Sequence, residues 1–305
     1  MQRWGRTSLG KVRFFCPVCR KTAIHKRDDL VKRHIAQELV DWLGGKESLG
    51  DIARKAHKTR QALSKEFHPL FLHTIEPLIP ADTKVKTLIL DGTYIHGHTL
   101  CALIAIDENR KIYWRFAPWE SYKVWLHFLY PFVQPEIVVM DGQKGLFAAT
   151  RRLWPTVAIQ RCQFHVISFA IQYLGRRPKD EAGKALLDIL YTLKEAKTFE
   201  GRDQWIRVYK KWEDTYADML AAKNVAGRFM YPRHRSARLV IRRALPNLFT
   251  FLDHPGAPNT TNLVEGGINS AIAEALRLHR GLRLHEKKML AAVILSQLRE
   301  KWMNI

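Results

Sequence analysis

The pattern of apolar and polar residues predicts a β-rich segment followed by alternating helices and strands. Three apolar runs, VKTLILD, LCALIAID and KIYWRFAP, lie between residues 85 and 118, separated by GTYIHGH and by the turn ENR. A helical pattern over about 120–132 then precedes the apolar run EIVVMD, the helical run GLFAATRRLW and the short strand VAIQRC. Because a three-stranded meander followed by alternating elements forms a mixed sheet, we expect an α/β fold with five strands flanked by helices.

Helices are predicted on both sides of this β-rich region. Residues 36–80 have a helical pattern and end in IEPLIPAD, a Pro-containing stretch that indicates a linker. Residues 166–250 predict an all-helical segment, and a final pair of helices is expected over about 262–301, after the loop DHPGAPNTTN. Aromatic residues recur at helical spacing in the all-helical segment, at Trp205, Tyr209, Trp212 and Tyr216. This spacing favours the core stripe of an amphipathic helix over a base-stacking platform.

Composition makes a polyanionic partner the first expectation. The 305 residues include 50 Lys and Arg against 29 Asp and Glu, which gives a formal net charge of +21. Such an excess favours nucleic acid first and a membrane surface second. The sequence contains no apolar run long enough to cross a membrane and no signal-peptide pattern, so we expect a cytoplasmic protein with no membrane partner. Its four cysteines do not form a disulfide framework.

Two aspartates that end apolar strands are the first candidates for chemistry. Asp91 follows LIL and Asp141 follows VVM, and each precedes glycine. Asp-Gly is also ordinary turn chemistry, in which the carboxylate accepts local backbone hydrogen bonds. If the two strands are adjacent and parallel, however, the carboxylates lie side by side and repel one another unless a cation lies between them. Hard oxygen ligands of this kind indicate Mg²⁺ or Mn²⁺.

A third carboxylate is expected from the segment NTTNLVEGGIN. Glu265 stands on the first turn of a predicted helix, from which it can point toward the edge of the sheet. The spacing of Asn262 and Glu265 is also that of a capping box, so a purely local role remains open. Three other acids, Asp82, Asp107 and Asp253, are weaker candidates because each stands in a turn-like context.

Residues 47–67 have the spacing of a helix-turn-helix, with the turn near His57. The side chains that would face the DNA major groove are Lys58, Thr59, Arg60 and Gln61. Any short helical hairpin gives a similar pattern. A second basic segment, RHRSARLVIRR, would either follow the phosphate backbone or form a solvated helix face, with Arg235, Arg238, Arg242 and Arg243 as the candidate contacts.

The N-terminal residues contain half of a zinc-binding pattern. Cys16 and Cys19 form a single CxxC, whereas a full zinc ribbon needs two such pairs. His25 and His34 could complete an unusual site. Zinc binding is the less favoured interpretation, and residues 1–35 are interpreted as a partial zinc-ribbon-like or simply basic segment.

Four motifs in order resemble those of a known family. LILDGTYI, VVMDGQKGLFAA, RCQFHV and TTNLVEGGIN occur in the order and spacing of bacterial insertion-sequence transposases related to Mutator-like elements. The resemblance covers about residues 85–300 and implies a DDE transposase with a ribonuclease-H-like core. It implies that Asp91, Asp141 and Glu265 are the catalytic acids and the metal ligands. It also matches the family's Cys-x-x-His pair to Cys162 and His165, for which we expect a packing or supporting role.

The resemblance also implies an organisation and a function for the whole chain. We expect a helix-turn-helix module over residues 36–80, a catalytic core over 84–168, a helical insertion over 169–254, and core helices carrying the third acid over 255–305. The implied activity is Mg²⁺-dependent DNA cleavage and strand transfer at the terminal inverted repeats of the element and in target DNA. A homodimer or higher oligomer on DNA, in the bacterial nucleoid, is expected. The alternatives are a non-catalytic transposase-derived DNA-binding protein and a ribonuclease-H-like nuclease.

Overall fold

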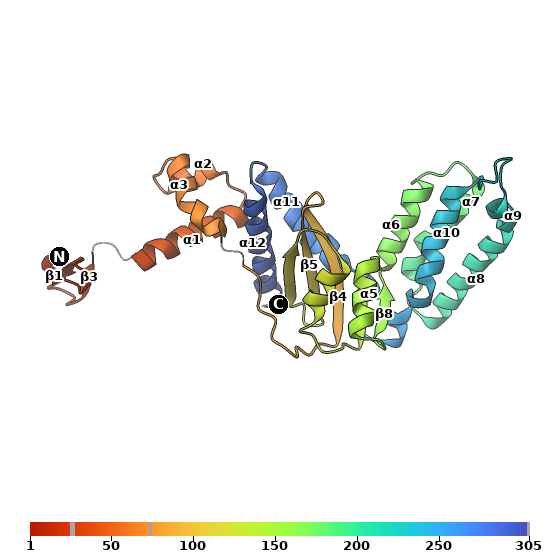
Figure 1. Ribbon diagram of the computed structural model, residues 1–305, viewed down its shortest axis with the longest axis horizontal. Helices are drawn as coiled ribbons and strands as arrows, with labels where there is room; N and C mark the ends of the chain where they lie inside the picture. Colours follow the sequence, from red (N-terminus) through yellow and green to blue (C-terminus); the bar gives the residue numbers. More distant parts are fainter. Residues whose placement is uncertain (25–27, 73–74, 304–305) are drawn as a thin grey trace. The chain divides into compact units, whose positions relative to one another are not determined.

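The computed structural model describes residues 1–24, 28–72 and 75–303, and the chain divides into two compact units (Figure 1). The first unit comprises Met1–Ile75 and Ala275–Val293. The second comprises Glu76–Glu274 and Ile294–Ile305. Each unit therefore combines segments that are far apart in the sequence.

A five-stranded mixed sheet forms the centre of the second unit, as the sequence pattern predicts. Its strand order is β6-β5-β4-β7-β8. The pairs β4·β5 and β5·β6 are antiparallel, whereas β4·β7 and β7·β8 are parallel. The strands are β4 (Thr87–His96), β5 (Leu100–Asp107), β6 (Ile112–Ala117), β7 (Ile137–Met140) and β8 (Ala158–Arg161).

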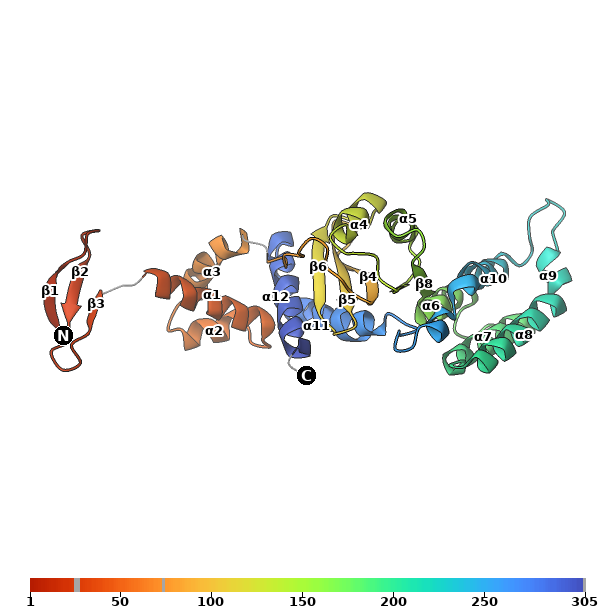
Figure 2. The ribbon, with the colours of Figure 1, turned by 90° about the horizontal axis from the view of Figure 1, so that it is seen from below.

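Two helices, α4 (Tyr122–Leu129) and α5 (Lys144–Leu153), cover one face of this sheet (Figure 2). Leu88 and Leu90 of β4 pack there with Trp125 and Phe128 of α4 and with Leu146 of α5. The odd-numbered neighbours on β4 point to the opposite face, because successive strand residues alternate. Asp91 is therefore on the face away from this core.

The expectation that the first strand ends at Asp91 is wrong. β4 continues through Gly92 to His96 and stays paired with β5 over that length. The continuation contains Thr93, Tyr94 and Ile95, which are residue types that favour strands. Asp91 thus lies in the middle of β4, at the level where the neighbouring strand β7 ends.

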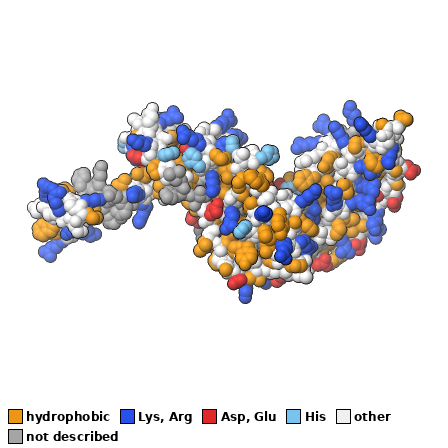
Figure 3. Space-filling view, viewed as in Figure 1, with side chains coloured by type: hydrophobic (Ala, Val, Ile, Leu, Met, Phe, Trp, Pro, Cys, Tyr) orange, Lys and Arg blue, Asp and Glu red, His pale blue; other side chains and the backbone are white. Residues whose placement is uncertain are grey.

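The all-helical segment predicted after the sheet is present. Its elements are α6 (Gln163–Leu174), α7 (Glu181–Thr192), the 3₁₀ turn η2 (Leu193–Glu195), α8 (Phe199–Thr215), α9 (Ala217–Ala221), α10 (Pro232–Ala244), and the 3₁₀ turns η3 (Leu245–Asn247) and η4 (Thr250–Asp253). Together they enclose a hydrophobic core of their own. Figure 3 shows Lys and Arg side chains over much of the visible surface of this segment. Gln160 of β8 holds the segment to the sheet by donating to the Leu248 carbonyl at 2.9 Å, and Gln163 of α6 donates to the same carbonyl at 3.1 Å.

The aromatic stripe on α8 is a core stripe, as expected. Trp205, Tyr209 and Trp212 are all buried, and their rings stack in succession. The indole N–H groups of Trp205 and Trp212 donate to the carbonyls of Ile189 and Ala182, at 2.8 and 2.9 Å. The rings are therefore used inside the protein and are not a platform for bases.

Replacing Trp205 by Ala should lower the free energy of unfolding by about 3–5 kcal/mol, because the change removes a large buried side chain and leaves a cavity. It also removes the indole donor to the Ile189 carbonyl, which keeps its hydrogen bond from Thr192 Oγ1. Val208→Ala is the matched control, since Val208 is on the same helix but exposed. Chemical denaturation measures both variants; equal, small effects would contradict the core assignment.

The first unit contains a small sheet and a group of helices. The sheet consists of β1 (Gln2–Arg6), β2 (Val12–Phe15) and β3 (Thr22–Ile24), and the helices are α1 (Asp28–Gly44), α2 (Leu49–Lys55), α3 (Arg60–Phe67) and η1 (His68–Leu72). The helix α2 begins with a capping box between Ser48 and Asp51, and Thr59 caps α3. Between them, at the predicted turn, His57 adopts φ +52°, a left-handed geometry that His tolerates better than most residues.

The last part of the chain forms a π-helix (Leu263–Asn269, labelled η5) that runs into α11 (Ser270–Leu278), followed by α12 (Leu284–Met303). None of the helices in the described part of the chain combines the length and apolar character that a membrane span requires.

Candidate active site

The sheet brings Asp91 and Asp141 to the same level. β4 and β7 are adjacent and parallel, and Leu90 lies opposite Met140, so Asp91, the next residue of β4, is level with Asp141, the first residue after β7. Asp91 Oδ1 accepts from the Gly92 N–H at 2.9 Å, and Asp141 Oδ1 accepts from the Gln143 N–H at 2.7 Å. Local backbone bonding, the ordinary role of Asp-Gly, therefore uses one oxygen of each carboxylate.

Gly142 provides room for a positively charged neighbour. Its φ is +84°, and a Cβ at this position would collide with the guanidinium of Arg161. Arg161 Nη2 donates to the Asp141 carbonyl at 2.8 Å from the end of β8. Burial lowers the pKa of Arg161, while the Asp141 charge acts in the opposite direction. A residue with a side chain in place of Gly142 would displace this arginine.

Glu265 comes from the π-helix and not from a capped α-helix. The Asn262 side chain makes no capping hydrogen bond, so the capping-box alternative is wrong. The Glu265 N–H instead donates to the Thr261 carbonyl at 3.2 Å. Asn269, at the other end of the π-helix, hydrogen-bonds to Thr93 on β4 and so fixes the helix against the sheet. Short π-helical segments occur often at functional sites, since the extra residue changes the direction of a side chain.

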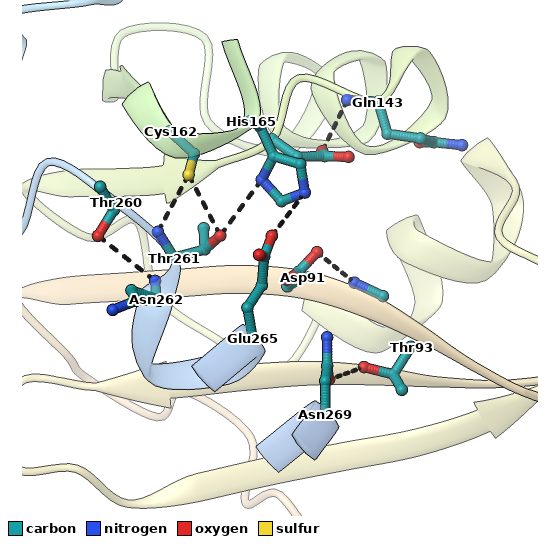
Figure 4. A network of polar contacts seen from close by, with 12 residues as sticks. Asp91, Thr93, Gln143, Cys162, His165, Thr260, Thr261, Asn262, Glu265 and Asn269 are labelled. Atoms are coloured by element: carbon teal, nitrogen blue, oxygen red, sulfur yellow. Dashed lines mark hydrogen bonds and ion pairs between the residues drawn. The ribbon is translucent and has the colours of Figure 1, made fainter. Parts of the chain in front are cut away.

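His165 and Cys162 connect Glu265 to helix α6 (Figure 4). His165 Nε2 lies 2.7 Å from Glu265 Oε1, and His165 Nδ1 lies 3.4 Å from Thr261 Oγ1. The Thr261 N–H donates to Cys162 Sγ at 3.2 Å. Cys162 is fully buried, and burial raises the pKa of its thiol, so it serves as a neutral packing and acceptor group.

The carboxylates destabilise one another in the absence of a cation. Burial raises the pKa of Asp91 to about 8, and the charges of Asp141 and Glu265 add to the effect. Burial also raises the pKa of Glu265, which His165 partly opposes. Groups in this situation either keep a proton or bind a cation.

Three of these side chains are close enough to share one metal ion. Asp91, His165 and Glu265 each offer a ligand atom, and the three atoms lie within 4.8 Å of one another. Two carboxylate oxygens and one imidazole nitrogen form a donor set that suits a divalent cation. Among residues 1–24, 28–72 and 75–303, no other group of three such side chains has this arrangement. The site therefore can bind a metal.

A known protein family matches most of the sequence. The family described as "Transposase, Mutator family" matches residues 30–272, well over half of the sequence. The chain belongs to the Mutator family of transposases. No curated protein matches the sequence. Family membership implies DNA as the partner and a divalent metal as the usual cofactor, which agrees with the net charge and with the metal-binding group of the site.

The transposase has a further acid at the site that sequence reasoning missed. Glu120 lies between β6 and α4, and a Cβ on Gly92 would collide with its carboxylate. Burial raises the pKa of Glu120 to about 7, and the charge of Asp141 adds to the effect. The sequence offers little signal for Glu120, because an acid just before the helix-capping Ser121 is common for local reasons.

The predicted DNA-contacting residues near α3 divide into two groups. Lys58 forms ion pairs with Glu66 at 2.6 Å and Glu38 at 3.5 Å, and Thr59 Oγ1 caps α3. Both therefore already support the helices. Arg60 and Gln61 are exposed on the first turn of α3.

The basic residues of α10 divide in the same way. Arg238 Nε lies 2.8 Å from Glu213 Oε1, and Arg242 Nε lies 3.8 Å from the same oxygen. Arg235 donates to the Leu220 carbonyl at 2.6 Å and lies over the Phe229 ring. Arg242 and Arg243 are exposed, so these two are the more accessible of the predicted contacts.

The CxxC pair lies in the turn between β2 and β3. The cysteines form no disulfide, and the Cys19 backbone amide lowers the pKa of the Cys16 thiol. Within the described part of the chain, no third His, Cys, Asp or Glu joins them in a metal-binding group. Of the two histidines considered, His25 lies outside the described residues, and His34 Nε2 lies 3.3 Å from Glu38. Nothing in this region adds to the zinc hypothesis.

Proposed function

We propose that the protein is a DDE transposase with a ribonuclease-H-like core, which cleaves and transfers DNA strands at the terminal inverted repeats of its insertion sequence. The observation that carries the proposal is the convergence of acids from three separate elements. Asp91 on β4, Asp141 after β7 and Glu265 on the π-helix meet at one end of a parallel strand pair, where ligands bind in α/β sheets.

The metal ligands in this proposal are Asp91, Asp141 and Glu265, with Mg²⁺ or Mn²⁺ as the cation. Asp141 lies outside the group of Asp91, His165 and Glu265 whose ligand atoms lie within 4.8 Å of one another, and His165 is assigned to positioning because it already pairs with Glu265. Such an ion, when bound, supplies the positive charge that activates a water or 3′-hydroxyl oxygen and stabilises the leaving 3′-oxygen. The protein contributes position and charge. Local backbone bonds hold Asp91 and Asp141, while His165 orients Glu265 through the contact at 2.7 Å.

The DNA-reading part of the proposal is the pair of helices α2 and α3, acting as a helix-turn-helix. α3 carries Arg60 and Gln61 on its exposed first turn, where the side chains of a recognition helix contact base edges. Exposed arginines on α10, Arg242 and Arg243, would follow the phosphate backbone outside the recognised sequence. The transposase would act as a homodimer or higher oligomer that holds two DNA ends.

The experiment that tests the proposed function is incubation of the full chain with DNA carrying the ends of its element, with Mg²⁺, with Mn²⁺ and with neither. Metal-dependent nicks at the repeat ends, followed by joined products, are expected. Specific binding without any cleavage would favour the non-catalytic DNA-binding protein. Metal-dependent cleavage that ignores the repeats would favour the nuclease.

Glu120→Gln should reduce strand cleavage by roughly 10- to 100-fold, the range seen when groups around a metal's direct ligands are removed. The loss should shrink at high Mg²⁺, because the removed charge assists metal retention. Glu136→Gln is the control, since Glu136 is an exposed carboxylate just before β7. Cleavage rates measured against Mg²⁺ concentration test the prediction; identical curves for both variants and the parent would exclude a role for Glu120.

A further inference from the structure

A basic hollow in the first unit lies beside the exposed face of α3. Its volume is about 1310 Å³, and residues from α3, from the start of η1 and from the turn between α11 and α12 line it. Small-molecule pockets are usually about 300–1,000 Å³ and largely enclosed, so an open hollow of this size suits an extended ligand. All lining residues belong to the one unit.

The charged groups of the hollow are nearly all positive. Arg60 and Lys65 come from α3, and Arg280 and Arg283 come from the turn. All four side chains are exposed. The acid that lines the hollow, Glu286, already accepts from the Arg283 N–H at 2.6 Å. The hollow therefore attracts an anion, and its large open volume favours a polyanion.

The floor of the hollow has unmet hydrogen-bonding capacity. Trp42 and His279 line it, and each is 7% exposed. Trp42 Nε1 and His279 Nε2 are both buried, and neither has a hydrogen-bond partner among the described residues. Buried polar atoms are normally paired with protein or water. This floor thus has polar atoms that ordered water or a polar ligand could satisfy.

We infer that α3 and the turn over residues 278–283 clasp one sugar–phosphate strand of duplex DNA, with Arg280 and Arg283 as phosphate contacts. The inference rests on the proposed function, in which α3 enters the major groove. The backbone is the ridge that borders this groove, so a helix inside the groove places the ridge against whatever lies beside the helix. In this unit that neighbour is the C-terminal turn, about 220 residues later in the sequence.

Arginine is suited to this role, since its guanidinium can donate two parallel hydrogen bonds to a phosphate. Hydrogen bonds within the protein also stabilise the turn. The His279 N–H donates to the Ala275 carbonyl at 3.0 Å, and Arg280 Nε donates to the Arg277 carbonyl at 3.2 Å. Phosphate contacts fix register without reading sequence, whereas base contacts specify it. The turn with Arg280 and Arg283 should therefore contribute affinity for any duplex, whereas α3 should contribute the preference for one sequence.

The test compares two variants of the full chain with the parent on two duplexes, one with the element's end and one of random sequence. Arg280→Gln with Arg283→Gln should weaken binding to both duplexes by a similar factor. Because each neutralised phosphate contributes about 0.9 to the slope of log affinity against log salt, the slope should fall by about 1.8. Gln61→Ala should leave that slope unchanged and lower the preference for the element's end by about ten-fold.

Two controls keep the result interpretable. Lys210→Gln with Lys211→Gln removes the same charge from an exposed part of α8 and should change the slope by less than half as much. Arg280→Lys with Arg283→Lys keeps the charge and should restore most of the slope. An unchanged slope in the Gln double variant, an equal drop in the α8 control, or no recovery with Lys would each overturn the inference.

Failure of the inference can be told apart from failure of the proposed function. If the parent chain does not prefer the element's end over random DNA, the proposed reading of the repeats by α3 is wrong. If the parent shows that preference while the Arg280 and Arg283 double Gln variant binds as the parent does, only the inferred phosphate contacts are wrong.

Discussion

Asp141→Asn should abolish strand cleavage while leaving DNA binding intact. The change keeps the shape of the side chain and its bond to the Gln143 N–H, but it removes a charge that the proposed metal ion requires. Loss of several kcal/mol of transition-state stabilisation lowers the rate by a factor on the order of 10³ or more. Cleavage assays on DNA carrying the element's end, with binding titrations in parallel, measure both properties.

The same result is expected for Asp91→Asn and Glu265→Gln. The matched control is Asp82→Asn, because Asp82 is an exposed turn residue at φ +56°, a conformation that Asn also tolerates. Near-normal cleavage by Glu265→Gln would mean that the third acid lies elsewhere, and Glu120 would then be the first replacement to consider.

The metal-free transposase should lose stability as the pH rises from about 5 to 8. Asp91 has a pKa of about 8 in the folded protein against an ordinary value of 3.8, so the folded state holds a proton that the unfolded state has released. A group with a raised pKa stabilises the folded state when the pH is below the pKa that the group has in the unfolded chain. This stabilisation is lost as the pH rises through the pKa that the group has in the folded protein. Over three pH units this amounts to at most about 4 kcal/mol, since one unit corresponds to 1.36 kcal/mol.

Divalent metal should reverse this trend. Metal ligands must be deprotonated, so Mg²⁺ competes with protons and stabilises the protein more at pH 8 than at pH 6. Thermal unfolding midpoints at both pH values, with Mg²⁺ and with a chelator, measure the effect. Asp91→Asn is the control, because it removes the Asp91 contribution and should weaken the pH dependence, while Glu120, whose pKa is raised to about 7, retains part of it. A midpoint shift with Mg²⁺ of the same size at both pH values would contradict the prediction.

Much of the fold follows from local pattern. Apolar runs of strand length and helical periodicities placed the five strands and the all-helical segment, because these signals depend on neighbours a few residues apart. The stretch from Leu88 to Asp91 shows what such local signals leave undecided. The pattern located the strand, but its continuation to His96 depends on pairing with β5, a partner that a single strand's sequence does not specify.

The sequence predicted only part of the candidate site, because local patterns locate a strand but not the segments that pack against it. The sequence by itself determined that Asp91 and Asp141 each follow an apolar run, and parallel pairing of β4 with β7 then placed them at one level. The role of Glu265 was undecided, because the capping-box spacing describes a local bond equally well. Tertiary packing decided its position, since Glu265 contacts His165, a residue 100 positions earlier in the sequence.

Only the tertiary structure decided which basic and acidic side chains already contact other groups of the protein. Glu120 reaches the site because Gly92 on a neighbouring segment has no side chain. Lys58 and Arg238 look like free cations in the sequence, yet both pair with acids of other helices. Charge along a chain determines what kind of partner the protein attracts, because long-range attraction depends on total charge. Which side chains can contact that partner depends on packing between distant segments, and no local pattern encodes it.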